Sequence, residues 1–97
     1  MGIFSNKTKY KFNEDKMLIK LQAYIDNTYD QHYSTDKIQA TEFIIDSGHG
    51  EGFCIGNIMK YAQRFGKKEG RNEKDLYKVI HYAIILLGSM QEEQNGS

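Results

Sequence analysis

Polar and basic side chains recur at helical spacing between residues 57 and 68. They lie at i, i+3, i+4, i+7 and i+11: Asn57, Lys60, Tyr61, Arg64 and Lys68. A helix presents side chains at these spacings on one face. Arginine can grip a phosphate group through two hydrogen bonds, and lysine adds a compact positive charge. The spacing therefore predicts a binding face for a phosphate-bearing ligand, and a solvated basic surface is the alternative interpretation.

Three further residues could complete such a site. Lys67 follows the basic face in a charged, glycine-containing loop, from which it can close over a bound phosphate. His32 can act as an acid, a base or a phosphate donor near neutral pH, or it can be a merely exposed loop histidine. Tyr82, like Tyr61, offers a ring on which a nucleobase can stack.

The sequence lacks the common catalytic and metal-binding motifs. No G-x-x-x-x-G-K-[ST] run occurs, although glycines gather at residues 48–52. The one cysteine, Cys54, has no base near it in the sequence, and the histidines lack zinc-binding spacing. Glu42 and Asp46 lie four residues apart and could share a divalent cation, but an exposed acidic face is the more ordinary interpretation. We therefore assign no catalytic residue and no metal ligand.

Length and charge restrict the classes of protein that remain. The 97 residues and 11.3 kDa form one helical domain, because two hydrophobic cores would not fit. Thirteen Lys and Arg residues balance thirteen Asp and Glu residues, which argues against binding of bulk nucleic acid. No apolar run reaches the ~18 residues of a membrane span, so no membrane partner is expected. A chain this short buries a modest core, and we expect a homo-oligomer.

Hydrophobic periodicity predicts an all-α fold, a small bundle of about four helices. The expected helices cover residues 14–28, 36–46, 53–65 and 72–90, with the last one fraying into 91–97. Asn13, Asp36 and Asn72 are expected to begin helices, and Gly48 and Gly66 to end them. Residues 48–52 are expected to be a flexible link. Residues 1–12 have no helical stripe and are expected to be a flexible arm, or to pack on a partner chain.

Four stretches of the sequence resemble the SaV-like family of small bacteriophage proteins. They are residues 32–33, 38–44, 53–68 and 75–82, and the resemblance covers roughly residues 30–90. Its most specific part is the run G-N-x-x-K-Y-x-x-R that begins at Gly56. The positions that match the family pattern are Gly56, Asn57, Lys60, Tyr61, Arg64, Lys67, Lys68, Asp75, Lys78 and Tyr82.

The resemblance implies a phage or prophage origin and a place in the cytoplasm of an infected bacterium. Most of the family has no known function. One group of relatives is the nucleotide kinase of T7-like phages, which phosphorylates deoxynucleoside monophosphates, and another is implicated in sensitivity to an abortive-infection system. The sequence departs from the family pattern at Val79, where Ala is common, and at Gln39, where Glu is common. The second departure removes a carboxylate.

Three functions fit these observations. The first is binding of a nucleotide or another phosphate-bearing small molecule, extending to a non-Walker deoxynucleoside monophosphate kinase that would use ATP and Mg²⁺. The second is a sponge that sequesters a nucleotide signal of host defence and needs no catalytic acid. The third is an interaction module that binds a host enzyme through the aromatic arm at residues 1–12 and an apolar face.

Overall fold

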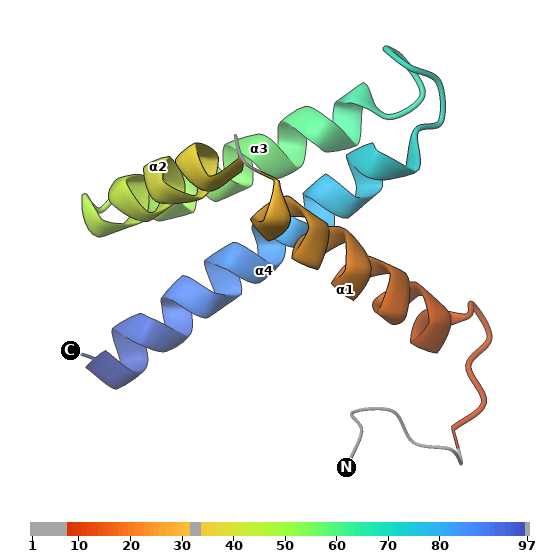
Figure 1. Ribbon diagram of the computed structural model, residues 1–97, viewed down its shortest axis with the longest axis horizontal. Helices are drawn as coiled ribbons and strands as arrows, with labels where there is room; N and C mark the ends of the chain where they lie inside the picture. The colour runs from red at the N-terminus through yellow and green to blue at the C-terminus, as the bar shows by residue number, and fades with distance from the viewer. Residues whose placement is uncertain (1–7, 32–33, 97) are drawn as a thin grey trace.

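The computed structural model describes residues 8–31 and 34–96. Within these ranges the chain forms four helices and no strand: α1 (Glu14–Asp30), α2 (Ser34–Asp46), α3 (Gly50–Arg64) and α4 (Glu73–Gly96) (Figure 1). The predicted all-α fold of about four helices is therefore confirmed. The arm predicted at residues 1–12 lies mostly outside the described residues.

The helices form two layers. The most extensive helix–helix interface joins α3 and α4, which run antiparallel as a helical hairpin. Both α1 and α2 lie on the same side of this hairpin, α2 over α3 and the end of α1 over α4 (Figure 1). The first half of α1 extends away from the other helices. One side of the α3–α4 hairpin is thus covered by helices, and the other side is not.

Local backbone chemistry explains the tight connection between α2 and α3. The N–H groups of Gly48 and His49 donate to the carbonyls of Ile45 and Ile44 at 3.0 and 3.1 Å. Gly48 has a φ of +91°, so this is a glycine-ended helix terminus of the Schellman type. The predicted end of the helix at this glycine is confirmed.

Gly50 corrects the prediction of a flexible link at residues 48–52. It is buried and begins α3, and a Cβ atom at this position would lie 2.9 Å from Cγ1 of Ile45. The absence of a side chain at Gly50 allows α2 and α3 to approach closely. The residue serves this helix contact, and not flexibility of the backbone. Glycine content alone does not separate these two roles.

The other helix termini agree only partly with the predictions. Asn72 caps α4 as expected, because its Oδ1 accepts from the N–H of Lys74 at 3.0 Å. Asn13 occupies the position before α1, but in a left-handed conformation and without a side-chain cap. The second helix begins at Ser34, two residues before the predicted Asp36, and α4 continues through Gly96 instead of fraying after residue 90.

Candidate ligand-binding site

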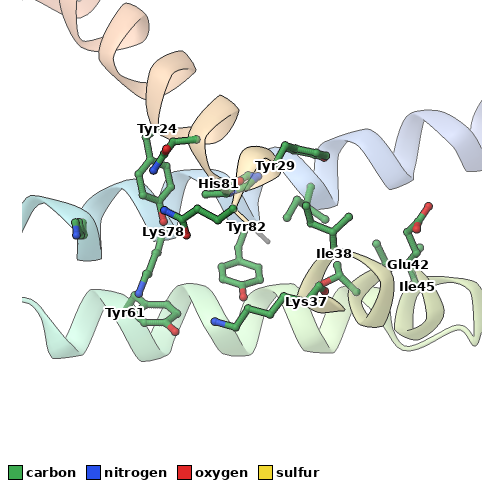
Figure 2. A pocket seen from close by; sticks show the side chains of 16 residues that line it. Tyr24, Tyr29, Lys37, Ile38, Glu42, Ile45, Tyr61, Lys78, His81 and Tyr82 are labelled. Atoms are coloured by element: carbon green, nitrogen blue, oxygen red, sulfur yellow. The ribbon is translucent and has the colours of Figure 1, made fainter. Parts of the chain in front are cut away.

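A pocket of about 380 Å³ lies on the covered side of the α3–α4 hairpin (Figure 2). Every helix contributes to its wall, and α1 and α2 form the sides that α3 and α4 leave open. Small-molecule sites in proteins occupy roughly 300–1,000 Å³. The pocket is therefore large enough for a ligand of the size of a mononucleotide.

Lysines dominate the charge of the pocket. Lys37 reaches in from α2 toward Tyr82, and Lys78 from α4 toward Tyr61 (Figure 2). Lys74 also lines the pocket, one helical turn before Lys78. The one carboxylate in the lining is that of Glu42. Three ammonium groups against one carboxylate create a local positive potential in a chain whose formal net charge is zero.

Tyr61 and Tyr82 form the aromatic floor of the pocket. Their rings are nearly parallel, with centroids 6.2 Å apart, and Tyr61 is buried. Three cations lie against the Tyr61 ring: Lys78 at 4.8 Å, Lys60 at 5.1 Å and Arg64 at 5.9 Å from its centroid. The negative face of an aromatic ring attracts cations at such distances. The ring thus holds positive charge beside the pocket.

Neighbouring aromatic rings hold Tyr82 in place beside the pocket. The pKa of Tyr82 is raised chiefly because burial disfavours the phenolate, and Tyr61 and Cys54 add to this effect. The Phe53 ring contacts Tyr82 edge-on, with centroids 5.7 Å apart. Tyr82 can therefore donate a hydrogen bond from a fixed position at neutral pH.

Tyr24 and His81 form a second aromatic group on the α1 side of the pocket. Tyr24 stacks on Tyr77 with centroids 5.3 Å apart, and His81 meets the Tyr24 ring edge-on at 6.2 Å. Burial lowers the pKa of His81 below its ordinary value of 6.5, because the charged imidazolium is poorly solvated there. His81 is thus mainly neutral at pH 7 and can both donate and accept a hydrogen bond.

The structure separates the residues that the sequence grouped on one helical face. Tyr61 lines the pocket, as does Tyr82 from α4, whereas Lys60 and Arg64 lie against the Tyr61 ring without lining it. The Nδ2 of Asn57 donates to the carbonyl of Phe53 at 2.9 Å, within α3. Asn57 is therefore engaged by its own helix.

Arg64 lies between two carboxylates. Its Nη2 is 2.8 Å from Oε2 of Glu69, and its Nε is 3.4 Å from Oδ1 of Asp75. Asp75 is 1% exposed, and its ion pair with Arg64 links the end of α3 to the beginning of α4. The arginine that the sequence suggested for phosphate binding thus also holds the hairpin together.

The remaining predicted residues lie away from the pocket or outside the described residues. Lys67 and Lys68 are exposed in the connection between α3 and α4, and neither lines the pocket. Gly66 and Gly70 in this connection both have positive φ, as a tight turn requires. His32 lies outside the described residues.

The sequence-based site prediction missed Lys37, Lys74, Lys78, His81 and Tyr24 as pocket residues. A signal existed for three of them, because Lys74, Lys78 and His81 follow one another at i, i+4 and i+7 and so share one face of α4. No sequence spacing connects Lys37 with them, since it comes from a different helix.

The described residues show neither a metal-binding cluster nor a membrane-spanning helix. No group of three or more His, Cys, Asp or Glu side chains in residues 8–31 and 34–96 is arranged to hold a metal ion. None of the helices in the described part of the chain has an apolar stretch long enough to cross a membrane.

The chain belongs to a family of proteins of unknown function, DUF3310, whose model matches residues 27–84. This match includes the last turn of α1, all of α2 and α3, and α4 as far as residue 84, which leaves out the pocket residues Tyr24 and Ile85. The Gene 1.7 protein of Enterobacteria phage T3 is 39% identical over 69 residues, which cover 65% of this chain and 42% of the phage protein. The relationship to bacteriophage proteins is thus supported.

Two alanine–tRNA ligases also match. The enzyme of Lawsonia intracellularis is 34% identical over 50 residues, 52% of this chain, and that of Blochmanniella floridana is 30% identical over 73 residues, 70% of this chain. The chain spans 6% and 8% of these two enzymes, and less than half of the phage relative. No solved structure matches the chain.

Proposed function

We propose that this chain binds a nucleotide, with a nucleoside monophosphate as the best-fitting ligand, in the pocket between α1, α2 and the α3–α4 hairpin. The observation that carries the proposal is the convergence of Lys37, Lys74 and Lys78 beside stacked tyrosine rings. Ammonium groups bind phosphate oxygens, and tyrosine rings stack on nucleobases. A mononucleotide carries both of these groups within the dimensions of the pocket.

The charges of the pocket favour a phosphate group over a neutral ligand. Lys74 and Lys78 lie one turn apart on α4, and their like charges repel each other unless solvent or an anion lies between them. Lys60 adds positive charge on the Tyr61 side, whereas the charge of Arg64 is compensated by Glu69 and Asp75. A bound phosphate would relieve this repulsion, so we expect binding to weaken as salt is added.

The polar groups on the α1 side suit the rest of a nucleotide. Asn27 lines the pocket together with the neutral imidazole of His81. The hydroxyls of Thr28 and Thr41 donate to backbone carbonyls within their own helices, and their oxygens still have lone pairs that accept. These groups could bind a sugar hydroxyl or the edge of a base.

Catalysis of phosphoryl transfer is the further step that the SaV-like resemblance suggests. The pocket supplies charge neutralisation, which phosphoryl transfer needs above all. Its one carboxylate, Glu42, could help to hold a Mg²⁺ ion that is also bound by substrate phosphates. A kinase would therefore need Mg²⁺ and ATP in addition to the monophosphate, whereas a nucleotide sponge would need neither.

Calorimetric titration with the four deoxynucleoside monophosphates tests the proposal. We expect Lys78→Ala to weaken binding by roughly 10- to 100-fold, since a hydrogen bond to a charged group contributes about 1.5–3 kcal/mol. Lys20→Ala is the matched control, because Lys20 is an exposed lysine of α1 that does not line the pocket. Equal affinities for the unchanged protein, Lys78→Ala and Lys20→Ala, or no binding at all, would refute the proposal.

Chromatography of the recovered ligand separates the three functions. Conversion of the monophosphate to a diphosphate in the presence of ATP and Mg²⁺ identifies a kinase. Recovery of the ligand unchanged under the same conditions identifies a sponge. Absence of nucleotide binding would favour the interaction module that binds a host protein.

A further inference from the structure

The side of the α3–α4 hairpin that faces away from α1 and α2 carries large apolar side chains with no cover. Six of them are between 42% and 64% exposed: Ile55, Met59, Leu76, Ile80, Leu87 and Met90. By contrast, Leu21, Cys54 and Tyr61 are the buried apolar residues of the described chain. An apolar surface of this kind marks an interaction site in a folded protein.

Helical spacing places these side chains on one continuous surface, which we call the bare face. On α4, apolar residues recur at intervals of four and three: Leu76, Ile80, Ala83, Leu87 and Met90. This is the heptad spacing of a helix that packs along another helix. On α3, Ile55, Met59 and Ala62 recur with the same intervals. Because α3 and α4 are antiparallel neighbours, the two stripes lie on the same side of the hairpin.

The contacts of the remaining α4 residues confirm this orientation. Tyr77 and His81 contact Tyr24 of α1, so they point to the covered side. Asp75 and Tyr82 contact residues of α3. One side of α4 thus faces α1 and another faces α3. The stripe from Leu76 to Met90 lies on the remaining side, and no helix in the described part of the chain packs on it.

We propose that a second copy of this chain covers the bare face, so that two α3–α4 hairpins pack together as a four-helix core. The α4 stripe is suited to its own copy, since residues 79–91 contain no Asp, Glu, Lys or Arg that would exclude an identical surface. Ala83 lies at the middle of the stripe, where a small side chain lets two helices approach closely. In an antiparallel pair about a two-fold axis at Ala83, Leu76 faces Met90 of the second copy, and Ile80 faces Leu87.

The chain exposes more surface than a compact monomer of its size, as expected if a second copy covers part of it. It exposes 7870 Å², whereas a compact chain of 11.3 kDa exposes about 5,700 Å². Part of this surplus belongs to the first half of α1, which extends away from the other helices (Figure 1). The surplus as a whole exceeds the ~800 Å² that each partner buries in a standard protein interface.

Sedimentation equilibrium of the full chain tests this interface. We expect the unchanged protein to be a dimer or a multiple of a dimer, and Ile80→Lys to reduce its mass to that of the monomer, because a buried ammonium without a partner is strongly unfavourable. The matched control is Phe43→Lys, the same kind of change at a side chain of α2 that is 73% exposed and lies outside the bare face. This variant should sediment like the unchanged protein.

Cross-linking provides a measurement that does not depend on a destabilised variant. The natural cysteine, Cys54, is fully buried, so an Ala83→Cys variant would carry one accessible thiol. Oxidation should link two Ala83→Cys chains, whereas the same change at Phe43 should give little cross-linked product. A monomeric unchanged protein would overturn the proposal and leave the bare face to a different protein. An oligomer whose mass is insensitive to Ile80→Lys, or that does not cross-link through position 83, would overturn it as well.

Discussion

The two sides of the α3–α4 hairpin differ in chemistry although they share the same two helices. The covered side has lysines, tyrosines and a histidine around a pocket, with α1 and α2 as its walls. The opposite side has aliphatic side chains and methionines at heptad spacing, with no wall. Helical periodicity makes this division possible, because residues one turn apart share a face while their neighbours point elsewhere. We therefore expect the proposed ligand binding and the proposed self-association to occupy opposite sides of one hairpin.

Opening the hairpin should weaken both the proposed nucleotide binding and the proposed assembly. Arg64→Ala leaves the buried carboxylate of Asp75 without its cation, and loss of one member of such a pair costs about 3 kcal/mol. We expect urea unfolding to show this loss of stability, with both nucleotide binding and assembly weakened. Lys68→Ala, at an exposed position in the same connection, is the control. Unchanged stability of Arg64→Ala would show that the ion pair does not hold the hairpin.

Displacing α2 should affect mainly the covered side. Gly50→Ala would place a methyl group 2.9 Å from Cγ1 and 3.3 Å from Cα of Ile45, and overpacking of this kind costs about 1–3 kcal/mol. Since α2 carries Lys37, we expect weaker nucleotide binding but an unchanged oligomeric state. Gly52→Ala is a matched control in the same helix, where a Cβ meets nothing within 4 Å. It should be neutral or stabilising by about 0.5–1 kcal/mol. Equal effects of the two changes on binding would contradict a close contact between α2 and α3.

Acidification should lower the free energy of unfolding through His81 on the covered side, by less than the two substitutions above. Burial lowers the pKa of His81 in the folded protein below 6.5, so the unfolded chain takes up this proton first as the pH falls. The free energy of unfolding should therefore fall as the pH drops below about 6.5 and level off below the folded pKa. We expect His81→Gln to flatten this dependence in urea unfolding between about pH 7.5 and 5. A pH dependence that is the same in His81→Gln as in the unchanged protein would contradict this expectation.

Much of the fold could be predicted from local sequence patterns. Apolar residues at helical spacing predicted four helices, and Asn72 and Gly48 marked a beginning and an end because their roles depend on the nearest backbone groups. The prediction was wrong at residues 48–52, where Gly50 serves a contact with α2 and not chain flexibility. A contact between two helices leaves no local pattern by which the two uses of glycine could be distinguished.

The site was predictable only in part, for a related reason. The spacing of Lys60, Tyr61 and Arg64 correctly places them on neighbouring turns of one helix, yet the structure directs Arg64 to two carboxylates that the spacing does not indicate. Lys37 and Lys78 are 41 positions apart in the chain and meet at one pocket because α2 packs beside the hairpin. The prediction of a phosphate ligand therefore survives as a proposal with a different set of lysines.

By itself, the sequence determined that the chain is helical, where α2 ends and α4 begins, and which residues share a face of each helix. These properties depend on backbone hydrogen bonds and side-chain periodicity within a few residues. Only the tertiary structure decided which face lines the pocket, that Arg64 forms ion pairs with Glu69 and Asp75, and which apolar face remained uncovered. Those outcomes depend on how helices distant in the sequence pack against one another, because a side chain acquires its partners and its exposure only from that packing.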